Sequence, residues 1–258
     1  MRKYTIAVLV TAAACLASGC AKKEVSVEVV SGAENENKPQ ISINENKPQI
    51  SIQENPAALF LKITAEYDSD WQDEHRLIST KTSQIRILDE DHAELQKALD
   101  ALNQKNLDSQ STFMADNQAD ARQMYQDKPE LMEDNGWESE LTLTAVRADE
   151  TVLCLRQTDY SWLGGAHPNT CITGITYDTQ TGAELSLKDI ANDYDGIYEY
   201  VLERLAKEHD PNMFFEQYED AVKAMFYGGD ADYSPVHWSL TNEGVTIWFN
   251  QYDIAPYA

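Results

Sequence analysis

The chain has little positive charge. It contains 20 Lys and Arg residues against 44 Asp and Glu residues, which gives a formal net charge of −24. Because nucleic-acid binding depends on cationic side chains that displace condensed counterions, this balance excludes nucleic acid as a partner. It also argues against electrostatic adsorption to anionic lipid. A solvated acidic surface explains most of such charge, and attraction to a cationic partner is the functional alternative.

The sequence also lacks the motifs that mark common catalytic and metal-binding sites. It has no His-Glu-x-x-His, phosphate loop, Gly-x-Ser-x-Gly or Cys-x-x-Cys. Its histidines show no mutual spacing suited to one metal ion; they are His75, His92, His167, His209 and His237. We therefore predict no catalytic residue, no metal and no cofactor.

Long apolar runs are missing too, so no membrane-spanning helix is predicted. The N-terminus carries a shorter run over residues 4–16, preceded by Arg2 and Lys3 and ending in Leu16-Ala17-Ser18-Gly19-Cys20. This pattern resembles a lipoprotein signal peptide with its lipobox. It predicts a signal peptide over residues 1–19 and lipidation of Cys20. An ordinary secretory signal is the alternative, and both place the protein outside the cytoplasm; lipidation would anchor it to the bacterial cell membrane by lipid alone.

Cysteine is scarce, with four residues in the chain. Cys15 would leave with the signal peptide and Cys20 would carry the lipid, so Cys154 and Cys171 remain. An even pair in an exported chain suggests a disulfide. If residues 151–160 and 168–177 form one antiparallel hairpin centred near Trp162-Leu163, the two cysteines lie opposite each other. Two free, buried thiols are the alternative.

Residues 20–56 are predicted to form a flexible, lipid-anchored linker. They contain a nine-residue repeat, Glu36–Asn44 and Glu45–Gln53, with proline and little apolar mass. Such a segment cannot offset its own ordering entropy by burial. From Ala57 to the end the composition is that of a globular domain.

The periodicity predicts an α+β fold with a mainly antiparallel sheet. It places a long helix in the N-terminal half, capped by Asp89 or Asp91 and ending at Lys128-Pro129, with an apolar stripe of Leu95, Ala98, Leu99 and Leu102. Two further helices are expected to pack on the sheet in the C-terminal half. The second C-terminal helix is expected to begin at Pro211. The predicted strands cover residues 59–66, 76–88, 137–147, 151–160, 168–177, 184–187, 236–240 and 245–250.

Several aromatic residues fall near predicted loops and strand ends, where aromatic side chains often act as binding anchors. Core packing of the same side chains is an equal alternative. The predicted binding residues are Tyr160, Trp162, His167 and Tyr177. The other aromatics in such positions are Tyr227, Tyr233, Trp238, Tyr252 and Tyr257.

Two segments carry a family resemblance: residues 164–170, Gly-Gly-Ala-His-Pro-Asn-Thr, and residues 177–190, with Tyr-Asp followed by Thr-Gly-Ala-Glu-Leu-Ser-Leu-Lys-Asp-Ile. They resemble the extracellular domain of the lysozyme-sensing anti-sigma factors of Gram-positive bacteria. The same module is the non-catalytic N-terminal part of a peptidoglycan deacetylase. The resemblance implies a deacetylase-associated half over residues 57–170 and an anti-sigma-factor-like half over 171–258. Family members usually continue into another strand, so truncation after Ala258 is expected.

The chain has neither the sigma-binding segment and membrane helix of the anti-sigma factors nor the metal-dependent catalytic domain of the deacetylase. The resemblance therefore implies a lipid-anchored binding protein of the cell envelope, whose ligand is a cationic protein such as lysozyme or a peptidoglycan component. One alternative is an envelope glycan hydrolase or deacetylase with an unrecognised site around His167. A purely structural surface lipoprotein is the other.

Lipidation can be tested by changing Cys20 to Ala. We expect the native protein to begin at an acylated Cys20 and to fractionate with membranes, and the variant to lose both properties. Intact mass spectrometry of both proteins measures this. Cys15→Ala is the matched control, because Cys15 would be removed with the signal peptide. An intact Met1 with an unmodified thiol at position 20 would contradict the prediction.

Overall fold

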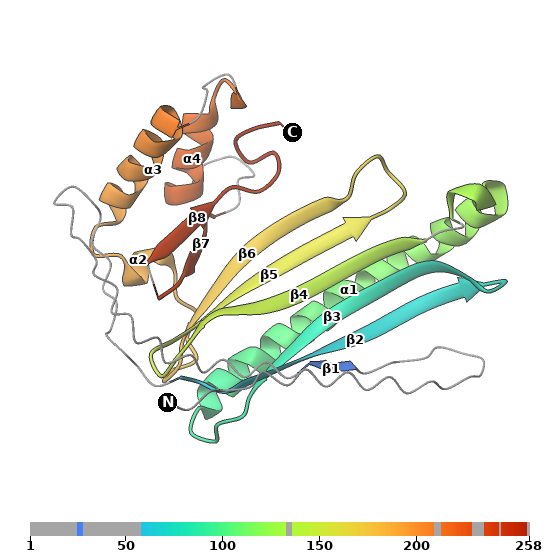
Figure 1. Ribbon diagram of the computed structural model, residues 1–258, viewed down its shortest axis with the longest axis horizontal. Helices are drawn as coiled ribbons and strands as arrows, with labels where there is room; N and C mark the ends of the chain where they lie inside the picture. Colours follow the sequence, from blue (N-terminus) through green and yellow to red (C-terminus); the bar gives the residue numbers. More distant parts are fainter. Residues whose placement is uncertain are drawn as a thin grey trace, which may run out of the picture.

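The main element of the fold is a six-stranded sheet with the strands in chain order (Figure 1). The computed structural model describes residues 58–132, 136–208, 213–228, 235–242 and 244–256, together with the backbone of 25–27. Its strands are β1 (Val25–Val27), β2 (Leu61–Gln72), β3 (His75–Ile87), β4 (Trp137–Ala148), β5 (Val152–Trp162) and β6 (Asn169–Asp178). Every neighbouring pair is antiparallel except β3 and β4. The predicted α+β fold with a mainly antiparallel sheet is confirmed.

The parallel pair is joined by one long helix, α1 (Ala93–Asp127), followed by the short 3-10 helix η1 (Pro129–Leu131). Parallel neighbours need such a crossover because the chain must return to the same end of the sheet. Leu95, Leu99 and Leu102 form the predicted apolar stripe and are buried against one face of the sheet. The predicted cap is wrong: His92 is the N-cap, and the Asp89 carboxylate instead accepts a hydrogen bond from the Phe60 amide.

Beside its leucine stripe, α1 carries amide side chains that bond the edge of β3. β4 pairs with β3 only from Ile78 to Thr82, so beyond that point β3 has a strand partner on the β2 side alone. The Asn103 side chain takes over there, accepting from the Ile85 amide at 2.9 Å and donating to the Ile85 carbonyl at 2.8 Å. Gln96 likewise accepts from the Ile87 amide at 2.8 Å. These bonds satisfy backbone groups that burial would otherwise leave unpaired.

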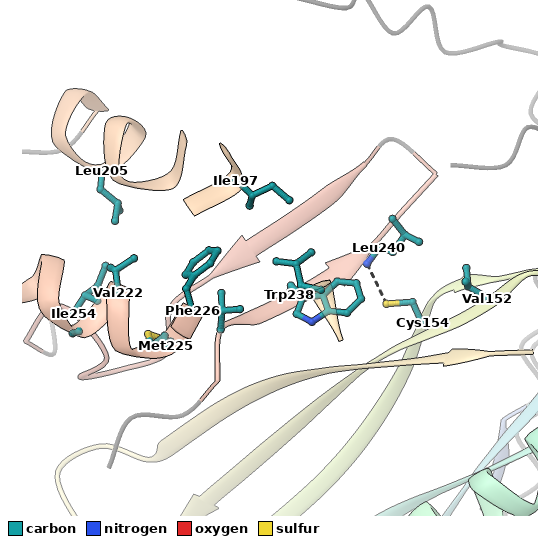
Figure 2. Close-up of a cluster of buried hydrophobic side chains, with 13 residues drawn as sticks. Val152, Cys154, Ile197, Leu205, Val222, Met225, Phe226, Trp238, Leu240 and Ile254 are labelled. Atoms are coloured by element: carbon teal, nitrogen blue, oxygen red, sulfur yellow. Dashed lines mark hydrogen bonds between the residues drawn. The ribbon is translucent and has the colours of Figure 1, made fainter. Parts of the chain in front are cut away.

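The C-terminal half builds a second core around a small two-stranded sheet. Its elements are α2 (Leu187–Ile190), α3 (Tyr194–Glu208), α4 (Tyr218–Tyr227), β7 (His237–Leu240) and β8 (Val245–Trp248). Both longer helices share buried apolar contacts with β7 and with the first residues of β5, Val152 and Cys154 (Figure 2). The helix expected from Pro211 begins at Tyr218. The expected strand at 184–187 is reduced to a single bridge between Glu184 and Tyr177, since Leu187 already starts α2.

β7 crosses β6 at Gly174. A side-chain carbon there would lie 1.6 Å from the Trp238 carbonyl oxygen, so only glycine allows the two backbones to approach this closely. The edge of β6 is held beside this crossing. Asn250 bonds both the amide and the carbonyl of Ile172, at 2.8 and 3.0 Å, and the Trp248 indole donates to the same carbonyl. The C-terminal half is therefore attached along the edge of the main sheet.

The predicted disulfide is wrong, because the hairpin register differs from the expected one. Cys154 pairs with Thr176, and Cys171 pairs with Asp159. The six-residue loop between the strands centres the hairpin on Gly165 and separates the cysteines by about 17 Å along the strands. Both thiols are free. The buried Cys154 sulfur accepts a hydrogen bond from the Leu240 amide at 3.2 Å (Figure 2). It also accepts one from the Thr176 hydroxyl.

Changing Gly174 to Ala tests the attachment of the two cores. We expect the free energy of unfolding to fall by about 1–3 kcal/mol, because the added methyl group forces β7 away from β6. Urea denaturation followed by circular dichroism measures the change. Gly165→Ala is the control, since a side-chain carbon there meets its nearest neighbour at an ordinary 3.8 Å. Equal stability of the two variants would show that the crossing is not tightly packed.

Candidate binding surface on the open face of the sheet

One face of the main sheet is covered by α1. Residues alternate between faces along a strand. Ser139 of β4 and Gln157 of β5 bond Gln110 and Asn106 of the helix, so the odd-numbered positions of these strands face α1. Even-numbered positions point away from it. The C-terminal half covers this second face only at the end near Cys154 and leaves the other end open (Figure 1).

The open end carries two rows of side chains that cross the sheet. The strand registers place Tyr67, Lys81, Glu140, Tyr160 and Thr170 side by side in one row. The same registers place Ser69, Ser79, Glu138 and Trp162 in the next row. Neighbours in such rows are close enough for direct side-chain contact. We call these nine residues, together with the adjacent Trp71 and Arg76, the open-face surface.

Paired charges occupy the middle of the open-face surface. The Lys81 ammonium lies 2.9 Å from a Glu140 oxygen, and the Arg76 guanidinium lies 3.6 Å from a Glu138 oxygen. All four side chains are partly exposed. Burial and the two neighbouring carboxylates raise the pKa of Tyr160, so its hydroxyl stays protonated at neutral pH and can donate a hydrogen bond.

Aromatic rings border these charges on both sides. On β5, the Trp162 indole donates to the Gly165 carbonyl at 3.0 Å, which fixes the ring beside the hairpin loop. On β2, the Trp71 indole donates to the Ser69 hydroxyl at 2.8 Å, and 57% of the Trp71 surface is exposed. A shallow depression of about 170 Å³ lies between β2, β3 and β4 and is lined by Tyr67, Trp71, Lys81 and Glu140 among others. The surface can thus offer ring faces and polar groups to the same ligand.

The four predicted binding residues do not all reach this surface. Tyr160 and Trp162 belong to it, and His167 lies in the exposed hairpin loop, where its Nδ1 contacts the Pro168 carbonyl at 3.0 Å. Tyr177 is 94% buried in the core between α1 and the sheet. Burial there, and next the carboxylate of Glu184, raises the pKa of Tyr177 to about 12. Tyr177 is thus placed for core packing, the alternative that the sequence left open.

Sequence reasoning missed the remaining half of the surface. Tyr67 and Trp71 lie on β2, far from the hairpin in the chain, and Glu138 and Glu140 were not distinguished from the many other acids. The alternation of Glu138 and Glu140 with buried neighbours was the available signal. It becomes informative only once the register between strands is known.

Within the described ranges, no group of three or more His, Cys, Asp or Glu residues could hold a metal ion. Nor does any helix in this part of the chain have the length and apolar character needed to cross a membrane. The predicted lipidation site, Cys20, lies outside the described residues, as does the linker apart from the backbone of β1.

The fold and the surface define a class: an α+β protein with a long crossover helix, a C-terminal unit attached at the sheet edge, and an open sheet face lined by aromatic and paired charged side chains. A family model described as deacetylase PdaC matches residues 34–170, more than half of the chain. The chain belongs to this PdaC family. A second model, described as protein of unknown function (DUF3298), matches residues 187–258. This confirms the module expected from the sequence resemblance and marks the protein as cell-envelope-related.

Solved structures of the DUF3298 family resemble the chain. One from Bacteroides fragilis is 16% identical with a TM-score of 0.54, covering 79% of this chain and 88% of its own. One from Pseudomonas aeruginosa is 19% identical with a TM-score of 0.46, covering 79% and 87%. The similarity to the Bacteroides fragilis structure supports the fold alone. No curated protein matches the chain.

Comparing Tyr177→Ala with Tyr160→Ala separates core from surface. We expect Tyr177→Ala to lower the free energy of unfolding by about 3–5 kcal/mol, because it leaves a cavity under α1. The loss for Tyr160→Ala should be clearly smaller, since its ring is partly solvated. Urea denaturation measures both. If the two losses are equal, Tyr160 is a core residue and does not belong to a binding surface.

Proposed function

We propose that this protein is a lipid-anchored, non-catalytic binding module of the cell envelope, and that its open-face surface binds the glycan chain of peptidoglycan. The observation that carries the proposal is the pair of cross-strand rows, in which rings from β2 and β5 flank hydroxyl groups and ion-paired carboxylates. The PdaC domain is usually the non-catalytic N-terminal part of deacetylases, which supports a binding role.

The chemistry of this surface suits a sugar chain. A pyranose ring presents apolar C–H groups on its faces and hydroxyl groups around its edge. An aromatic ring packs well against such an apolar face. Glu138 and Glu140 keep carboxylate oxygens available as acceptors, while Lys81 and Arg76 can donate. The depression is shallow and open, which favours an extended ligand lying across several strands over a small molecule enclosed in a pocket.

A titration with a tetrasaccharide of alternating N-acetylglucosamine and N-acetylmuramic acid tests the proposal. We expect Trp162→Ala and Tyr160→Ala each to weaken binding about tenfold, the effect typical of losing an aromatic anchor. Isothermal calorimetry measures the affinity. Phe60→Ala is the control, because Phe60 is 43% exposed but lies before the start of β2, at the other end of that strand.

The proposal fails if the unchanged protein does not bind the tetrasaccharide, or if Phe60→Ala weakens binding as much as Trp162→Ala. Turnover of acetylated glycan by the purified protein, abolished in His167→Ala, would instead favour the catalytic alternative.

A cationic protein such as lysozyme is the second candidate ligand. The net charge of −24 favours it, since a strongly acidic domain accelerates encounter with a basic partner. This interaction should weaken steeply as salt rises and should be insensitive to Trp162→Ala, whereas binding to the uncharged part of a glycan should depend little on salt. The two ligands are therefore distinguishable on the same proteins.

A further inference from the structure

Three tyrosines pack ring against ring on the surface of the C-terminal half. Tyr194 and Tyr198 are one helical turn apart on α3, and both meet Tyr227, the last residue of α4. The ring centroids of Tyr194 and Tyr227 are 5.9 Å apart and those of Tyr198 and Tyr227 are 5.2 Å apart, each pair edge to face. Tyr227 remains 42% exposed. We call this group the tyrosine cluster.

A cation of the chain itself lies over the tyrosine cluster. The Lys188 ammonium, on the one-turn helix α2, is 4.9 Å from the centroid of the Tyr194 ring and 5.8 Å from that of Tyr227. Both distances are within the range over which an aromatic face attracts a cation. Among the described residues Lys188 forms no salt bridge, so the rings are its principal partners. The cluster thus already holds an ammonium group.

Carboxylates surround the same rings. The Tyr227 hydroxyl donates to Asp195 at 2.6 Å. Burial raises the pKa of Tyr198, and the negative charges of Glu219 and Asp220 raise it further. A cation entering the cluster would therefore meet ring faces and several negative charges together. That combination is stronger for a desolvated cation than either feature alone.

We infer that the tyrosine cluster binds a lysine or arginine side chain of a basic protein partner, and that Lys188 occupies this site in the free protein. The inference rests on the second candidate function above and is independent of the glycan surface. The charge complementarity between the cluster and a basic partner identifies the occupant. Lys188 is exposed and its long stem is flexible, so it can leave the rings and return its ammonium to water when the partner binds.

The test removes the internal occupant. Lys188→Met should tighten binding of a hexalysine peptide, because the peptide no longer competes with Lys188 for the ring faces. Lys207→Met is the matched control: it removes the same charge from the last turn of α3, where Lys207 pairs with Glu203. We expect the gain for Lys188→Met to exceed that for Lys207→Met about threefold in calorimetry at fixed salt.

A second change removes a ring from the site. Tyr227→Leu keeps an apolar side chain on α4 but no aromatic face, and we expect it to weaken hexalysine binding about fivefold, with the unfolding midpoint measured in parallel to verify the fold. Equal gains in the two lysine variants, or unchanged affinity in Tyr227→Leu, would overturn the inference and leave Lys188 as a purely internal contact.

Tetrasaccharide binding measured on the same variants separates this inference from the proposed glycan function. We expect it to be unchanged in Lys188→Met and Tyr227→Leu. Loss of tetrasaccharide binding in these two variants would contradict the independence of the two sites.

Discussion

The structure depends on how the backbone of β3 is satisfied where β4 leaves it. Beyond Thr82 the buried edge of β3 has no strand partner, and unpaired buried amides and carbonyls are costly. Asn103 and Gln96 of α1 supply the missing hydrogen bonds, so the helix is held against the sheet by directional bonds as well as by its leucine stripe. The position of α1 then decides which face of the sheet is a core.

Because α1 covers one face of the sheet, the opposite face remains available for other contacts. The two ends of this opposite face differ. At the end near Cys154, Gly174 lets β7 approach the sheet, and the second core forms there. At the other end Tyr160 and Trp162 are only partly buried, and the cross-strand rows remain partly solvated. The candidate glycan surface is thus a consequence of incomplete coverage, while the tyrosine cluster belongs to the helices that do the covering.

The two candidate surfaces differ in chemistry. On the open face the carboxylates are paired with Lys81 and Arg76, so the local charge is nearly balanced and the rings dominate. In the tyrosine cluster, Lys188 lies over the rings and the Tyr227 hydroxyl is bonded to Asp195, so ring faces and a carboxylate side by side suit a basic partner. A PdaC-family envelope protein with both surfaces could engage a glycan and a basic protein on separate parts of the same chain.

Local sequence patterns determined the elements themselves. The spacing of Leu95, Leu99 and Leu102, with Pro129 as a stop, predicted the long helix. The ends of β3 to β6 agree closely with the predicted strands, whereas β2 extends to Gln72 and was expected to end at residue 66. The acid excess followed from composition alone. The helix and strand patterns depend on residues that are close together in the chain, so one sequence is enough to predict them.

Only the tertiary structure decided the register between neighbouring strands, and with it the face of the sheet on which each side chain lies. Cys154 and Cys171 were expected to meet, but a hairpin centre displaced toward Gly165 puts them on opposite faces of the sheet. The sequence did not distinguish Tyr160 from Tyr177, yet Tyr160 is partly exposed and Tyr177 is buried under α1. A shift of one residue moves every side chain of a strand to the opposite face of the sheet. The shift is set by the loop geometry together with packing between strands, and this packing joins residues that are distant in the chain.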